Sequence, residues 1–115
     1  MTSEEKQNEY YLIAKKAKVL QDNDLVFNDY RNIAKIHNPS HETCMVALEK
    51  DIHAIKYIER QTKEMQLFVI EKDYRALEYL KTPSFEVCLA AYKQNKDALS
   101  LMSDEMSDEI RMSTI

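Results

Sequence analysis

Glycine and tryptophan are absent from this sequence, and its 115 residues include only two prolines and two cysteines. The absence of glycine excludes a glycine-rich phosphate loop, a dinucleotide-binding fingerprint and a nucleophile elbow. The sequence also contains no His-Glu-x-x-His and no Cys-x-x-Cys motif. We therefore expect no catalytic residues, no cofactor and no resident metal, and we do not expect an enzyme.

Long hydrophobic runs are missing as well, and none approaches the ~20 residues that a membrane-spanning helix needs. The first six residues are polar and do not resemble a secretory signal. The formal net charge of −4 argues against non-specific binding to nucleic acid or to an anionic membrane. We expect a single domain over residues 1–115, located in the cytoplasm.

The chain does contain a tandem repeat of 22 residues, which occurs three times without a gap, over 38–59, 60–81 and 82–103. A fixed period of this size is typical of stacked-repeat proteins. The aligned columns are Ser40/Thr62/Ser84, Glu42/Glu64/Glu86, Met45/Leu67/Leu89, Leu48/Ile70/Tyr92, Asp51/Asp73/Asn95, Ala54/Ala76/Ala98, Ile55/Leu77/Leu99 and Ile58/Leu80/Met102.

Each unit reads as helix, turn, helix. The hydroxyl residue at the start, for example Ser40, is a favoured N-cap, and the glutamate two residues later complements the helix dipole. The turn residues Asp51, Asp73 and Asn95 are expected in the left-handed conformation that helix ends often use. Short helices are unstable alone, so the units must stack. The sequence therefore predicts an all-α fold of stacked repeats.

The flanks differ from the three units. Residues 1–20 predict an N-terminal capping helix, and 21–37 predict a degenerate repeat. Residues 104–115 predict an acidic, solvated tail. Within it, the sequence that begins at Ser107 resembles the start of a repeat unit at Ser84. We expect the core to form from the repeated apolar columns and to include Leu48, Ile55, Ile70, Leu77 and Leu99.

The segment 85–95, followed by Ala98 and Leu99, resembles the short tandem helical repeats of a domain of unknown function. Those repeats occur in giant-virus, phage and some bacterial proteins. The resemblance implies an all-helical repeat protein and a viral or phage origin, which places it in the host cytoplasm. It implies no catalytic residues.

One cluster has metal-ligand chemistry: His37, His41 and Cys44, with His53 or Glu42 needed as a fourth ligand. The alternative, which we favour, is that the histidines lie on the surface and the cysteine packs in a helix. The two cysteines, Cys44 and Cys88, share one column but lie two units apart. Stacked helices are ~8–10 Å apart, so we expect two free thiols and no disulfide.

The leading functional hypothesis is a non-enzymatic protein-binding module, in its most specific form an inhibitor of a host defence factor. We expect a protein partner and a homodimer formed through the C-terminal half, with no direct contact to nucleic acid or membrane. One alternative is an acidic mimic of nucleic acid, which requires a continuous acidic face. A second is a small metal-dependent enzyme. The expected partner-binding residues are Phe85, Tyr92, Lys96, Met102, Ile110 and Met112.

Overall fold

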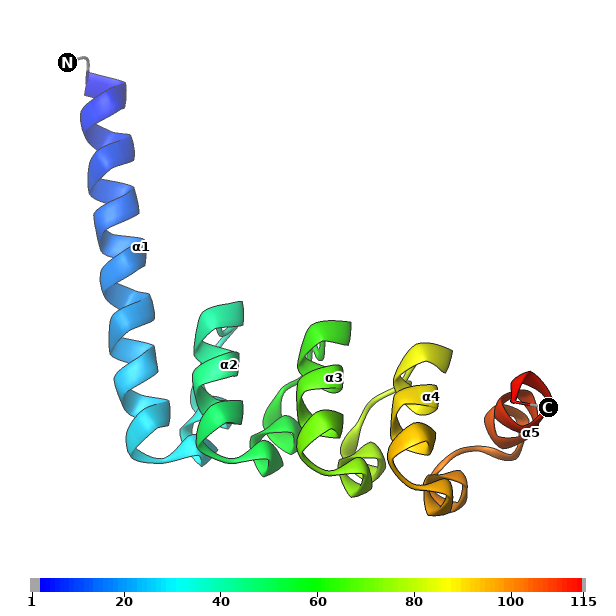
Figure 1. The fold of residues 1–115 in the computed structure, drawn as a ribbon. Helices are drawn as coiled ribbons and strands as arrows, with labels where there is room; N and C mark the ends of the chain where they lie inside the picture. The colour runs from blue at the N-terminus through cyan, green and yellow to red at the C-terminus, as the bar shows by residue number, and fades with distance from the viewer. Residues whose placement is uncertain (1–2, 115) are drawn as a thin grey trace.

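The computed structural model describes the backbone of residues 3–114 and the side chains of residues 7–114. All secondary structure in this part of the chain is helical (Figure 1). The elements are α1 (Ser3–Asn28), η1 (Tyr30–Lys35), α2 (His41–Lys50), η2 (Ile52–Tyr57), α3 (Lys63–Lys72), η3 (Tyr74–Tyr79), α4 (Phe85–Gln94), η4 (Lys96–Leu101) and α5 (Asp104–Ser113), where η denotes a 3-10 helix.

The 22-residue period is a structural period, as predicted. Each unit is an α-helix of ten residues, a 3-10 helix of six residues and an extended linker that leads to the next α-helix. The predicted N-caps are confirmed, because the hydroxyls of Ser40, Thr62 and Ser84 each accept the backbone N–H three residues later. The second helix of each unit is thus shorter and more tightly wound than an α-helix.

The prediction of left-handed turn residues is wrong. Asp51, Asp73 and Asn95 are extended, with φ of −160°, −161° and −157°. Each serves two helices at once, because its backbone N–H closes the preceding α-helix and its side chain accepts the N–H two residues ahead. Positive φ occurs instead at Asn38 (48°) and Thr82 (43°), directly before the two prolines of the linkers.

The units stack side by side into an elongated single layer of 63 × 31 × 18 Å. The helices α1 to α4 run in the same direction, and the 3-10 helices lie along one edge (Figure 1). Of the predicted core positions, Leu48, Ile55, Ile70 and Leu77 are at most 3% exposed. Leu99 is only half-buried, because it lies in the last unit, where one neighbour is missing. The fold is therefore a short α-solenoid.

Three further columns are buried and belong to the core. The short side chains of Ala47, Val69 and Ala91 are fully buried and let neighbouring helices approach. The other two columns are Thr43/Met65/Val87 and Cys44/Gln66/Cys88.

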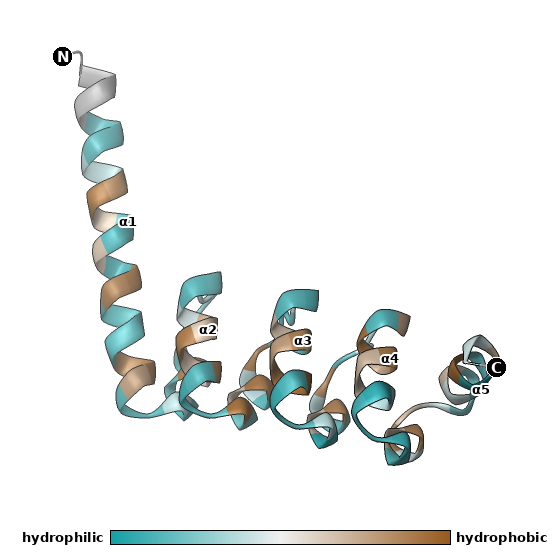
Figure 2. Cartoon of the chain, in the orientation of Figure 1, coloured by the Kyte–Doolittle hydropathy of each residue, from teal (hydrophilic) through white to brown (hydrophobic). Residues whose placement is uncertain are grey.

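The N-terminal helix does not end near residue 20. It continues to Asn28, and its last ten residues occupy the α-helix position of the degenerate unit, with Val26 fully buried beside α2. This part closes the stack. The part before it extends well beyond α2, with no other element beside it in Figure 1. Several turns of that projecting part carry the colour of hydrophobic residues in Figure 2.

The C-terminal residues form a regular helix rather than a solvated tail. The helix α5 begins after Ser103, whose hydroxyl accepts the N–H of Met106, and not at Ser107 as predicted. The linker before α5 has two residues, 102–103, whereas the linker before α4 has five, 80–84. This shorter linker places Ile110 in the core at 0% exposure. None of the helices in the described residues has the length and apolarity to cross a membrane.

Candidate interaction surfaces

Two rows of carboxylates run across the stack, and both are paired with neighbouring side chains. In the first row, each first-turn glutamate contacts the unit before it. Glu42 accepts from Asn23 at 3.2 Å, His41 Nε2 lies 3.2 Å from Glu64, and Lys63 is paired with Glu86. These contacts hold successive units in register, although exposed ion pairs contribute little each.

The second row consists of the turn aspartates. Asp29 and Asp73 each hold an arginine two residues ahead, at 2.9 Å to Arg31 and 3.0 Å to Arg75. These side-chain hydrogen bonds lower the pKa of both aspartates. The pKa of Asp51 is lowered as well, mainly by the backbone N–H of His53. In these two rows, Lys or Arg side chains pair with Asp29, Asp73 and Glu86, and histidines contact Asp51 and Glu64, so the rows do not form an unpaired acidic face.

A groove of about 860 Å³ opens between the linkers of successive units. We call it the linker groove. It is lined by Ile33, Ala34, Lys35, Ile36, His37, Asn38, Pro39, His41, Cys44, Lys56, Tyr57, Ile58, Glu59, Arg60, Thr62, Met65 and Lys81. Buried apolar side chains such as Ile33 and Ile58 form part of its wall.

The linker groove is basic although the whole chain is acidic. Four cationic side chains and two histidines line it, against the single carboxylate of Glu59. Some of them are already engaged, since the Lys56 ammonium lies 4.2 Å from the centre of the Tyr79 ring. Within the described residues, no ion pair holds Lys35, Arg60 or Lys81. These three cations can meet an anionic ligand.

A buried amide network fixes one wall of this groove. Gln61 stands where the other two units have proline, and its Oε1 accepts the backbone N–H of Lys81 at 2.8 Å. Its Nε2 donates to the carbonyl of Ile55 at 2.9 Å. The buried Gln66 donates both to Gln61 and to the carbonyl of Lys81, at 3.2 and 3.1 Å. The network ties two linkers together and positions Lys81 at the groove.

Sequence reasoning missed the linker groove. Its cations do not form a column, because Lys35, Lys56, Arg60 and Lys81 occupy four different repeat positions, the first two in 3-10 helices and the last two in linkers. An alignment of the repeats detects residues that share a column, and the cations of this groove share none.

The proposed metal-ligand cluster falls in the same groove. His37 and His41 are exposed, whereas Cys44 is only 2% exposed and belongs to the core. His41 already contacts Glu64. Among the described side chains, no group of three histidines, cysteines or carboxylates is placed to hold a metal ion. Cys44 and Cys88 are buried free thiols, and burial raises the pKa of both.

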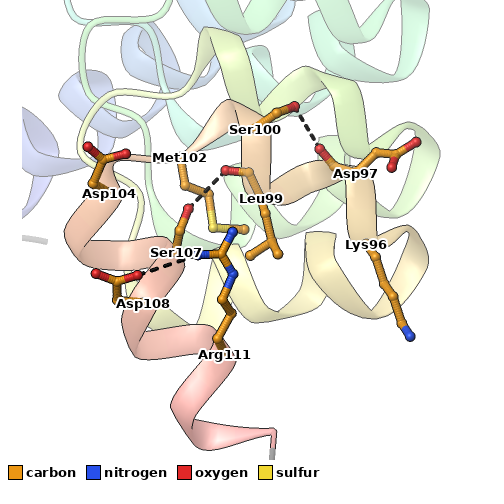
Figure 3. Close-up of a pocket in the computed structure, with 9 residues that line it drawn as sticks. All are labelled: Lys96, Asp97, Leu99, Ser100, Met102, Asp104, Ser107, Asp108 and Arg111. Carbon is orange, nitrogen blue, oxygen red and sulfur yellow. Dashed lines mark hydrogen bonds and ion pairs between the residues drawn. The ribbon is translucent and has the colours of Figure 1, made fainter.

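The predicted partner-binding residues are distributed around the last unit. Lys96 and Met102 line a pocket of about 830 Å³ between η4 and α5, together with Asp97, Leu99, Ser100, Asp104, Ser107, Asp108 and Arg111 (Figure 3). Within this lining, the Ser107 hydroxyl donates to the carbonyl of Leu99 at 2.9 Å and so joins α5 to η4. Phe85 and Tyr92 on α4 are half-buried.

The two remaining residues of that prediction lie on α5. Met112 is 75% exposed, whereas Ile110 is fully buried and contributes to folding instead of to a surface. Self-association through this C-terminal half remains a prediction.

No family model, no curated protein and no solved structure matches this chain.

Proposed function

We propose that the chain is a non-enzymatic protein-binding repeat module whose linker groove takes up an acidic segment of a partner protein. The observation that carries the proposal is the charge of the groove. In a chain of net charge −4, one groove gathers Lys35, Arg60 and Lys81 without ion-pair partners among the described residues. Such a local excess of cations attracts and orients an anionic partner.

The apolar wall favours a peptide over a nucleic acid. Tyr57 lines the groove with 41% of its surface exposed, and Ile33 and Ile58 pack beneath. An acidic segment that carries an aromatic or aliphatic side chain matches this combination of cations and apolar surface. A long nucleic acid extends beyond the groove and meets the carboxylates of the helices, which repel its phosphates.

Mimicry of nucleic acid is the less favoured alternative. A mimic needs a continuous unpaired acidic surface, and the two carboxylate rows of the repeats are interrupted by ion pairs such as Asp73 with Arg75 and Glu86 with Lys63. The metal-dependent enzyme has no supporting observation in the described residues. The more specific role, inhibition of a host defence factor by a viral or phage protein of the resembling repeat family, rests on the resemblance of the third unit.

The C-terminal surface is a second contact region in this proposal. Lys96 and Met102 line the pocket between η4 and α5, whereas Phe85 and Tyr92 lie on α4 and Met112 lies on α5. Arg111 and Asp108 at its rim are 3.5 Å apart and exposed, so both remain available for polar contacts.

The test is binding of a fluorescein-labelled peptide of eight aspartates and glutamates with two phenylalanines, measured by anisotropy. The double variant Lys35→Glu, Arg60→Glu reverses two cations of the groove. We expect at least tenfold weaker binding, about 1.4 kcal/mol. The matched control Lys72→Glu, Lys93→Glu makes the same change of charge on exposed helix positions and should bind nearly as the original chain does.

Two outcomes overturn the proposal. In the first, the groove variant and the control weaken binding equally, so that only net charge matters. In the second, a single-stranded oligonucleotide of equal charge binds the original chain more tightly than the peptide. The second outcome identifies a nucleic-acid-binding groove instead. Circular dichroism of each variant verifies that the fold is unchanged.

A further inference from the structure

A row of side chains begins in the linker groove and follows the 3-10 helices across the stack. Lys35, Tyr57 and Tyr79 are the last residues of η1, η2 and η3, and they occupy one repeat position, 22 residues apart. Lys35 and Tyr57 line the linker groove, whereas Tyr79 lies one unit further along the chain. We call these three residues the edge row. Because the 3-10 helices lie along one edge of the layer, the edge row crosses three successive units (Figure 1).

The two tyrosines of the edge row are held in the same way. The Tyr57 ring contacts the preceding 3-10 helix, with its centre 6.5 Å from the ring centre of Tyr30. The Tyr79 ring likewise contacts the preceding 3-10 helix, with its centre 5.8 Å from the ring centre of His53 and 4.2 Å from the Lys56 ammonium. Tyr57 is 41% exposed, and Tyr79 is half-buried. Aromatic rings that are fixed by neighbours and remain partly accessible are favoured contact points at protein interfaces.

The three 3-10 helices of the edge row are rich in tyrosine and in cations. Together they hold four tyrosines and four lysines or arginines against one carboxylate, that of Glu78 on η3. The unpaired cations Lys35, Arg60 and Lys81 lie at the groove, so the acidic residues of a ligand are attracted to that end of the row. The last 3-10 helix, η4, has no aromatic residue, and the aromatic surface therefore ends at η3.

We propose that the acidic segment bound in the linker groove continues along the edge row in the polyproline II conformation, with every third side chain on the row. Its acidic residues then lie against Lys35, and two apolar side chains three residues apart lie on Tyr57 and Tyr79. The inference rests on the function proposed above, and it adds the conformation of the partner segment and the spacing of its contact residues.

The dimensions of this conformation match the repeat. A polyproline II helix has three residues per turn and rises ~3.1 Å per residue, so every third side chain points the same way at intervals of ~9 Å. Neighbouring helices of a stack are ~8–10 Å apart, and the edge row supplies one side chain per unit. A β-strand presents every second side chain on one face, at intervals of only ~7 Å. Three residues of an α-helix cover only ~4.5 Å. Polyproline II is therefore the regular conformation that places a side chain on each unit.

Fluorescence anisotropy with four labelled peptides tests this spacing. All have the composition of the peptide described above, and their two phenylalanines are two, three, four or seven residues apart. Because only a spacing of three places both phenylalanines on the edge row, we expect this peptide to bind at least tenfold more tightly than the other three. Tyr79→Ser should remove that advantage. The matched control Tyr74→Ser changes a half-buried tyrosine at the other end of η3, outside the edge row, and should retain it.

Tightest binding at any other spacing overturns the inference, and a preference for seven identifies a helical ligand instead. Equal binding of the four peptides also overturns it. The proposed function survives that result if Lys35→Glu, Arg60→Glu still weakens every peptide.

Equal losses in Tyr79→Ser and Tyr74→Ser exclude a specific role of the edge row. Absence of binding by all four peptides overturns the proposed function together with this inference. Circular dichroism verifies the fold of each variant, and the comparison of the four peptides needs only the original chain.

Discussion

At the scale of single residues, the repeat is held by small and medium apolar side chains, each buried between two neighbouring units. Ala54, Ala76 and Ala98 are at most 2% exposed in all three units, so the 3-10 helix can pack closely on the α-helices. Where a polar residue enters this core, as Gln66 does, its amide is satisfied by Gln61 and a linker carbonyl. In the described residues no buried side-chain polar atom lacks a hydrogen-bond partner.

Leu77 is the most direct test of this packing. It is 3% exposed at the centre of the stack, whereas Leu99 occupies the same column in the last unit and is half-buried. We expect Leu77→Ala to lower the free energy of unfolding by about 2–5 kcal/mol. Leu99→Ala should cost less, because its cavity opens to solvent. Urea denaturation measures both, and equal costs would contradict the assignment of unit three as an incomplete end.

At the scale of elements, the features that depend on residues nearby in the sequence were predicted correctly. The features that depend on packing against a neighbouring unit were not. The N-caps Ser40, Thr62 and Ser84 were read from sequence because a cap acts on the N–H groups of its own helix. The start of α5 was misplaced, because a shortened linker and the burial of Ile110 decide it. The length of α1 was underestimated for the same reason, since contact with α2 defines the part that was read as a poor repeat.

The turn between α-helix and 3-10 helix gives a prediction of pH dependence. The pKa of Asp73 is lowered in the folded chain, first by the side chain of Arg75, so its stabilisation is complete above the unfolded pKa of ~3.9. That stabilisation is lost as the pH falls through the lower folded pKa. Asp29 and Asp51 behave alike, so stability should decline below about pH 4.

The variant Asp73→Asn isolates one of these turns. Asparagine keeps the side-chain oxygen that accepts the N–H of Arg75, as Asn95 does for Asp97 in unit three, but it does not titrate. Thermal unfolding between pH 2 and 6 should show a smaller loss of stability at low pH in this variant. Glu71→Gln removes one exposed carboxylate and serves as the control. If both variants lose as much stability at low pH as the original chain does, the turn aspartate does not contribute to the acid sensitivity.

At the scale of the whole molecule, the elongated stack separates the proposed activities in space. The linker groove lies at the first two linkers, the pocket lined by Lys96 and Met102 lies at the C-terminal end, and exposed apolar residues of α1 such as Tyr10 and Ile13 lie at the N-terminal end. The sequence predicted the stack, because a 22-residue period survives in its columns. It did not predict the groove, since Lys35 at the end of η1 and Arg60 and Lys81 in two linkers come together only when successive units stack.

Deletion of one complete unit tests the repeat architecture most directly. Removing residues 60–81 joins Glu59 to Thr82 and leaves His41 facing Glu86, a contact of the same kind as His41 with Glu64. The account predicts a folded chain with the same helical circular dichroism signal per residue and cooperative thermal unfolding. Removal of residues 60–70, half a unit, should abolish both. Loss of helix in the 22-residue deletion, or equal behaviour of the two deletions, would contradict a stack of interchangeable 22-residue units.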